Sequence, residues 1–162
     1  MTGLLAYASY LPAFRLAGAD IGTPKRDRVI ASYDEDSTTM AVAAAAVALR
    51  GHRAPPAVYF ATSSPAYADK TNATAIHAAL GLPPEVFAAD LGGAGRSGFA
   101  AIRAAGAGGG LAVCADVRVG RPCGSRRLGD TEHVHITPTR RQDGVDLRVP
   151  PGRASPRRSF WL

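Results

Sequence analysis

The chain has 162 residues, of which 46% are hydrophobic and 20% are charged. This length and composition predict a soluble globular domain and exclude a chain that is disordered throughout. The formal net charge of +6 is uneven: residues 121–162 hold nine Arg against four acids, whereas residues 1–120 hold ten basic and nine acidic residues. Because the first 120 residues are nearly neutral, the charge does not predict a nucleic-acid-binding domain, and a nucleic-acid partner is not expected.

The cysteines and the apolar runs exclude further classes of protein. Cys114 and Cys123 form no CxxC pair and have no histidine spacing typical of zinc, so neither a metal site nor a disulfide framework is expected. The N-terminus lacks a basic leader, and the longest apolar run, residues 41–49, is too short to span a membrane. We therefore expect a cytoplasmic protein without membrane association.

The first elements are a strand, a loop and a helix. Residues 3–11 alternate in character and predict a strand, and residues 12–31 are expected to form a loop. An alanine-rich helix follows, with Asp36 or Ser37 as its N-cap and Gly51 directly after its end. This helix has the clearest signals in the chain.

Strands and helices continue to alternate beyond this helix. Residues 57–62 predict a buried strand and residues 73–80 a helix, because breakers such as Pro83 and Pro84 bound them. The stretch 87–117 then adds a strand, a glycine-rich turn, a helix and a last strand. Such alternation predicts an α/β fold of three layers around a mostly parallel sheet.

The stretch from Phe87 to Val117 is the part of the sequence that most resembles a site. Its glycine-rich turn allows a tight bend or the close approach of a ligand. The helix after it is expected to begin with Ser97 as N-cap and to bury one stripe, Phe99, Ile102 and Ala105. With its many Ala and Gly residues, this helix is expected to lie between two layers.

Five segments together resemble the N-terminal half of the thiolase superfamily, in particular hydroxymethylglutaryl-CoA synthase and 3-oxoacyl-acyl-carrier-protein synthase III. The resemblance covers residues 3 to about 119, and it implies half of the family's five-layer fold. The segments are GLLAYASYLPAFRL, SYDEDSTTMAVAAA, YFATSSPAYADKTNATAIHAALGLP, AADLGGAGRSGFAAIRAA and LAVCAD.

The resemblance implies a site whose reactive groups this chain replaces. Family members carry a nucleophilic cysteine five residues after the aspartate of the strand before the central helix, and counting from Asp90 reaches Gly95. The related synthases place an acid/base glutamate where this chain has Ser63. Ser97 is the remaining candidate nucleophile, with no base in view. The family's further catalytic residues come from a second half, so acyl transfer by this chain alone is not expected.

The resemblance also implies the ligands and partners. Acyl-CoA or an acyl carrier is the family's substrate, and no other cofactor is expected. The small apolar helix needs cover on its outer side, which predicts self-association, as a dimer, or a complementary thiolase-like half. Thiolase-like proteins without the cysteine, of the lipid-transfer or aldolase kind, act with a partner and form an alternative.

A dinucleotide-binding site is a second alternative. Gly93, Gly95 and Gly98 form a GxGxxG pattern between a strand and a helix, and Asp116 ends the next strand about 20 residues on, as a ribose ligand would. The upstream helix and the DKTN segment have no counterpart in that interpretation.

Residues 120–162 differ in composition from the part before them. They are rich in Arg and Pro and predict an irregular tail after a domain over residues 1–119. His133 and His135 have no third ligand for a metal. The change in composition near Gly120 favours a truncated or frame-disrupted relative of a longer lipid-metabolic synthase.

Overall fold

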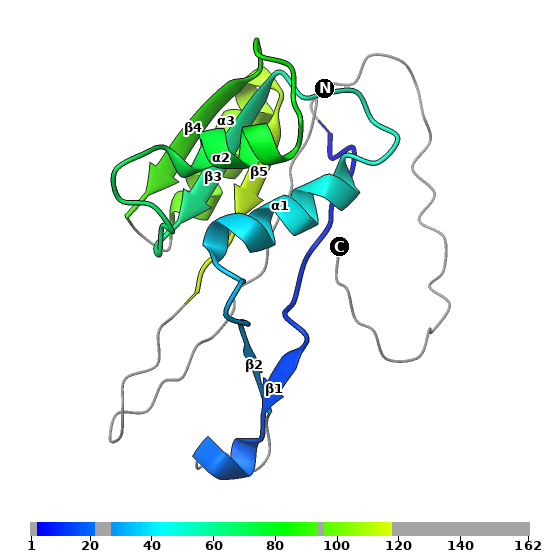
Figure 1. Ribbon diagram of the computed structural model, residues 1–162. Coiled ribbons are helices and arrows are strands. Elements are labelled where there is room, and N and C mark those ends of the chain that lie inside the picture. Colours follow the sequence, from blue (N-terminus) through cyan, green and yellow to red (C-terminus); the bar gives the residue numbers. More distant parts are fainter. Residues whose placement is uncertain (1–2, 22–26, 94–95, 118–162) are drawn as a thin grey trace.

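The computed structural model describes residues 3–21, 27–93 and 96–117 (Figure 1). The expected boundary at residue 119 and the tail beyond it lie outside these residues. The described elements, in chain order, are β1 (Phe14–Leu16), the short 3-10 helix η1 (Gly18–Ile21), β2 (Arg28–Ile30), α1 (Ser37–Ala48), β3 (Ala57–Thr62), α2 (Asn72–Ala79), β4 (Phe87–Gly92), α3 (Ser97–Gly108) and β5 (Leu111–Cys114).

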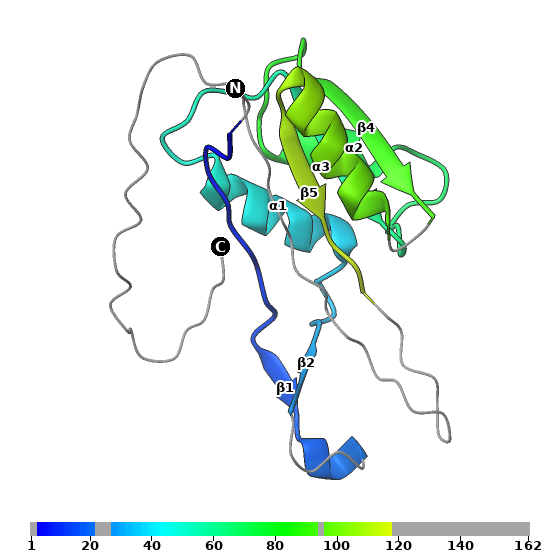
Figure 2. The same ribbon diagram turned by 180° about the vertical axis from the view of Figure 1, so that it is seen from behind.

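A parallel sheet of three strands organises the fold. The strand order is β4-β3-β5, and both neighbours run parallel to the central strand β3. Helices α1 and α2 lie on one face of the sheet, and α3 lies on the other, as the two opposite views show (Figures 1 and 2). The prediction of a three-layer α/β arrangement with a mostly parallel sheet is confirmed.

Helix α1 begins where its cap predicts. Asp36 is the N-cap and accepts a hydrogen bond of 2.7 Å from the Thr39 backbone N–H, while the Thr39 hydroxyl accepts one of 2.8 Å from the Asp36 N–H. This reciprocal pair satisfies two backbone donors at the start of the helix. The chain leaves the helix through Gly51, whose φ of 74° suits glycine.

The first 31 residues differ from the prediction. Residues 3–11 form no strand, and the expected loop instead contains β1 and β2, which pair antiparallel and project as an arm away from the sheet (Figure 1). Within residues 3–11 only Ala8 is buried, at 1% exposure in the core beneath α1 and α2, whereas Leu4, Leu5 and Tyr7 are exposed. The Tyr10 hydroxyl holds this segment by donating a hydrogen bond to Glu35 Oε1.

The two faces of the sheet bury different side chains. Because neighbouring residues of a strand point to opposite faces, Val58 and Phe60 of β3 face α1 and α2, whereas Ala61 belongs to the cluster with α3. The α1/α2 face has the larger core, and the buried residues of the α3 face are the four alanines Ala61, Ala101, Ala105 and Ala112. No helix within the described ranges is long and apolar enough to cross a membrane.

Candidate functional site

The candidate site lies at the edge where the three parallel strands end. Ser63 directly follows β3, Gly93 follows β4, and Asp116 comes two residues after β5. The carboxyl ends of parallel strands are where α/β folds place their ligands, because the loops there converge above the sheet. The sequence-predicted residues that can be described therefore lie at the edge expected for a site.

Asp116 joins the ends of β3 and β5. Its Oδ1 atom accepts hydrogen bonds from the Thr62 hydroxyl at 3.0 Å, the Ser63 backbone N–H at 2.5 Å, the Ser63 hydroxyl at 2.9 Å and the Ser64 hydroxyl at 3.4 Å. The Ser64 hydroxyl also accepts a bond of 2.8 Å from the Val117 N–H. Thr62 and Ser64 were not predicted as site residues. Their position as polar residues directly at a strand end was the available signal.

Ser63 is exposed, and its hydroxyl is bound to Asp116. A serine hydroxyl does not titrate near neutral pH, so Ser63 cannot exchange a proton as a glutamate at this position would. The nearby carboxylate of Asp116 is occupied in holding the loop after β3. In the described structure this group of residues connects the ends of β3 and β5 by hydrogen bonds.

A second carboxylate, Asp90 of β4, caps helix α2. Asp90 Oδ1 accepts a bond of 2.6 Å from the Ala73 N–H, and Oδ2 accepts bonds of 2.7 and 3.1 Å from the Asn72 backbone and side chain. Asn72 is 2% exposed, and its Oδ1 accepts further bonds from the Tyr67 N–H at 3.0 Å and the Thr38 hydroxyl at 3.3 Å. The Asp90 carboxylate thus lies at the positive, N-terminal end of α2, where the DKTN segment enters the helix.

The start of α3 differs from the prediction in two respects. Ser97 is the first helical residue rather than the N-cap; Arg96 precedes it, and the Ser97 hydroxyl donates a bond of 3.2 Å to the Gly92 carbonyl. Phe99 is 67% exposed, so it does not belong to the buried stripe, whereas Ala105 is buried as predicted, together with Ala101, and Ile102 is partly buried against them.

Cys114 ends β5 and lies against the first turn of α3. It is half-buried at the end of the strand. A Cβ atom on Gly98 would lie 3.1 Å from the Cys114 Sγ, a tight contact that glycine avoids. Gly95, the residue at the predicted nucleophile position, lies outside the described residues.

The strand order disagrees with the dinucleotide-binding alternative. In that fold the glycine-rich loop and the ribose-binding acid follow adjacent strands. Here β3 lies between β4, which precedes the glycines, and β5, which precedes Asp116. Asp116 is also engaged by Thr62 and Ser63.

The described residues contain no group of three or more His, Cys, Asp or Glu side chains that could hold a metal ion.

No protein-family model matches the chain. It is 35% identical over 138 residues to the hydroxymethylglutaryl-CoA synthase of Thermococcus sibiricus and 33% identical over 138 residues to that of Pyrococcus furiosus. Each alignment covers 74% of this chain and 39% of the relative, so the chain spans about two fifths of the length of the curated relatives it matches.

Solved structures show the same fold. The 3-oxoacyl-(acyl carrier protein) synthase III of Aquifex aeolicus superposes with a TM-score of 0.72 at 23% identity, over 88% of this chain and 55% of that one. MvaS in complex with 3-hydroxy-3-methylglutaryl coenzyme A superposes with a TM-score of 0.69 at 21% identity, over 85% of this chain and 40% of that one. In each case about half or less of the larger protein is matched, which fits an N-terminal half.

Proposed function

Because this chain is a homologue of hydroxymethylglutaryl-CoA synthase and 3-oxoacyl-(acyl carrier protein) synthase III and has a thiolase-like fold, we propose that it binds an acyl-CoA without forming an acyl-enzyme. The proposal is carried by Gly95, which the resemblance assigns to the position of the family's nucleophilic cysteine. Glycine has no side chain to attack a thioester.

Ser63 supports the same proposal. Condensation needs a group that moves a proton at the reacting carbon, and the serine at the acid/base position cannot supply it. Its hydroxyl donates to Asp116 Oδ1 at 2.9 Å and serves to hold the loop after β3. Loss of the nucleophile and loss of the acid/base group together favour binding over acyl transfer.

The ligand class is proposed from one structural relative. MvaS was solved in complex with 3-hydroxy-3-methylglutaryl coenzyme A, and it shares the described fold. We extend the same ligand class, a coenzyme A thioester, to this chain. A role in lipid metabolism in the cytoplasm, through self-association or with a complementary thiolase-like half, belongs to the same proposal.

Mass spectrometry and calorimetry test the proposal together. The purified chain is incubated with acetyl-CoA, and we expect no covalent mass increase but heat from reversible binding. The variant Gly95→Cys is expected to give no condensation product, because the Ser63 hydroxyl does not act as an acid or a base near neutral pH. An acetyl adduct that maps to Ser97 or Cys114 would contradict the non-acylating part, and absence of binding heat would contradict the ligand class.

A thiolase-like subunit of the cysteine-less lipid-transfer or aldolase kind is the second candidate, and Gly95 favours it too. Such a subunit is expected to show activity only when its partner is added.

The expected truncation or frame disruption near Gly120 is tested separately, by translating the downstream nucleotide sequence in three frames. A second frame that encodes a continuing thiolase-like half would support it, and stops in every other frame would contradict it.

A further inference from the structure

The two edge strands of the parallel sheet differ in burial. The strand order is β4-β3-β5, so β4 and β5 each have one neighbour among the described strands. No residue of β4 is buried, whereas Leu111, Ala112 and Val113 of β5 are at most 2% exposed. An edge strand ordinarily leaves its outer row of N–H and C=O groups in water. The outer edge of β5 is therefore covered.

The backbone of Ala112 faces this outer edge. The Ala115 N–H donates a bond of 3.2 Å to the Ala61 carbonyl of β3, and backbone groups of alternate residues in a strand point to the same side. Leu111 and Val113 therefore bond to β3, and Ala112 directs its N–H and C=O away from it. Ala112 is 0% exposed, so these groups do not reach water, and buried backbone groups are nearly always hydrogen-bonded. A further strand along β5 would satisfy them.

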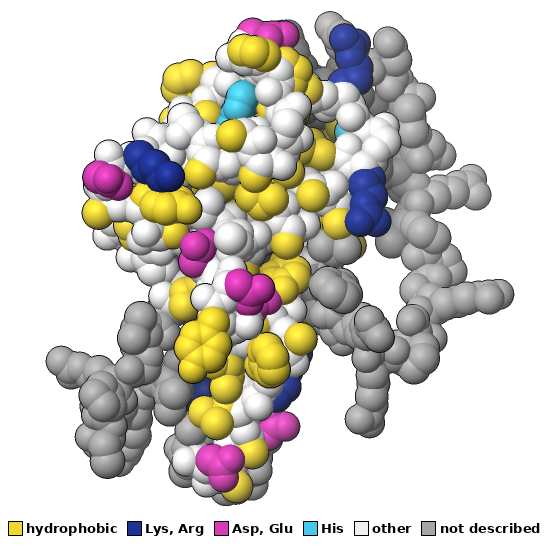
Figure 3. Space-filling model, in the orientation of Figure 1, with side chains coloured by type: hydrophobic (Ala, Val, Ile, Leu, Met, Phe, Trp, Pro, Cys, Tyr) yellow, Lys and Arg dark blue, Asp and Glu magenta, His cyan; other side chains and the backbone are white. Residues whose placement is uncertain are grey.

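The N-terminal part of the chain does not supply this strand. Residues 3–11 contribute the buried Ala8 to the same core, but they form no strand and do not pair with β5. In the arm, β1 and β2 pair with each other. Its Phe14 and Ile30 are exposed, and hydrophobic side chains lie on the surface of the arm in Figure 3. The strand that covers β5 must therefore come from outside the described residues.

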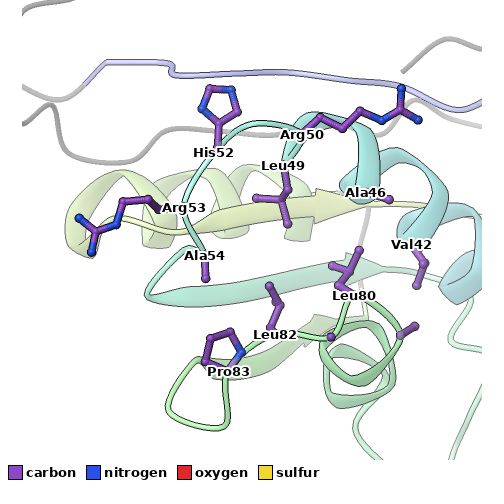
Figure 4. Close-up of a pocket in the computed structure, with 12 residues that line it drawn as sticks. Val42, Ala46, Leu49, Arg50, His52, Arg53, Ala54, Leu80, Leu82 and Pro83 are labelled. Carbon is purple, nitrogen blue, oxygen red and sulfur yellow. The ribbon is translucent and has the colours of Figure 1, made fainter.

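A pocket of about 380 Å³ lies between the ends of α1 and α2 (Figure 4). Its lining comes from α1, from the loop before β3 and from the end of α2 with the loop after it, and no residue of β5 belongs to it. Its basic side chains Arg50, His52 and Arg53 point in different directions in Figure 4. This pocket is therefore separate from the covered edge of β5.

Residues 145–149 have the sequence pattern of the strand that is needed. They read Val-Asp-Leu-Arg-Val, so that apolar and charged side chains alternate. This period of two is typical of a strand with one buried and one solvated face. Residues 118–144 connect the segment to β5 and allow either direction of pairing, since a parallel neighbour needs a connection of about a dozen residues and an antiparallel one as few as about two.

We propose that residues 145–149 of this chain add a fourth strand to the sheet, along the outer edge of β5. The side chains of Val145, Leu147 and Val149 face the core under α1, which contacts β5, and the backbone of the segment bonds to Ala112. Asp116 follows β5 and holds the loop after β3, so the added strand also supports the candidate site from its side.

Amide hydrogen exchange of the full-length chain, measured by NMR, tests this pairing at single residues. In the wild type the Ala112 N–H is expected to exchange as slowly as the Val113 N–H, which bonds to β3. Leu147→Pro breaks the segment at its centre and is expected to raise the exchange rate of Ala112 roughly tenfold, the effect of losing one backbone hydrogen bond, while Val113 is unchanged. The matched control Ala154→Pro lies beyond the segment and is expected to change neither rate.

A pair of serine substitutions tests which face of the segment is buried. Leu147→Ser removes an apolar side chain from the buried face and is expected to speed the exchange of Ala112, whereas Arg148→Ser on the solvated face is expected to have no effect. Fast exchange of Ala112 in the wild type would overturn the proposal. Slow exchange that survives Leu147→Pro would also overturn it and assign the covering to another segment. Protection that is lost on dilution of the sample would overturn it as well, because a second copy would then supply the strand.

Discussion

The two faces of the central sheet are packed in different ways. The face under α1 and α2 buries large side chains, among them Val58, Phe60, Ile76 and Val113. The face under α3 buries alanines, and Cys114 lies against Gly98 there. Burial of large apolar groups supplies most of the hydrophobic free energy, whereas small residues mainly permit close approach. The face under α3 is therefore expected to contribute less to the stability of the fold.

Truncation of Phe60 tests the face under α1 and α2 most directly. Phe60 is completely buried, so Phe60→Ala is expected to lower the free energy of unfolding by about 3–5 kcal/mol. Phe99→Ala on α3, where the ring is 67% exposed, serves as the matched control with little expected change. Urea unfolding followed by circular dichroism measures both. Equal losses would show that the two faces do not differ as described.

Enlargement of Ala105 tests the close-packed face. Ala105 is completely buried between α3 and the sheet, so Ala105→Leu is expected to force them apart and destabilise by about 1–3 kcal/mol. Ala107 is exposed on the same helix, and Ala107→Leu controls for helix propensity. Thermal unfolding of both variants gives the comparison. An Ala105→Leu protein as stable as the wild type would mean that the interface between α3 and the sheet accommodates a larger side chain.

Asp90 of β4 links the sheet to helix α2 by accepting hydrogen bonds at the start of that helix. Asp90→Asn replaces one of the two accepting oxygens by an NH2 group, so the N–H groups of Asn72 and Ala73 can no longer both keep their acceptor, and a loss of about 1–2 kcal/mol is expected. Asp69→Asn makes the same change at an exposed residue just before the helix, and no loss is expected there. Amide hydrogen exchange in α2 provides a local readout. Unchanged protection in α2 would contradict the capping role.

Tyr10 gives the smallest effect, confined to alkaline pH. Burial, followed by the hydrogen bond to Glu35, raises its pKa from 10.0 to about 12. A raised folded-state pKa stabilises the fold below pH 10, and this contribution is lost as pH rises from 10 towards 12. Tyr10→Phe is therefore expected to flatten the decline of Tm over this range. A parallel decline in both proteins would show that Tyr10 titrates alike when folded and unfolded.

The site was predictable in part, and for identifiable reasons. Ser63 was named from the resemblance and Asp116 as the ribose ligand of the dinucleotide alternative, both at strand ends, and the structure brings the two into contact. Their role in connecting the ends of β3 and β5 was not predictable, since it depends on the pairing of β5 with β3. Ser97 was expected to cap α3, but its hydroxyl bonds to Gly92 instead, a contact that depends on the turn before the helix.

By itself the sequence determined helix α1, strand β3 and the parallel character of the sheet. Caps such as Asp36, breakers such as Gly51 and unbroken apolar runs act over a few neighbouring residues, so they can be read locally. Only the tertiary structure decided that residues 3–11 pack without strand pairing. It alone also decided the order β4-β3-β5 and the position of a pocket between the ends of α1 and α2. These features arise from contacts between residues far apart in the chain, and such contacts form only where the packed core brings their partners together.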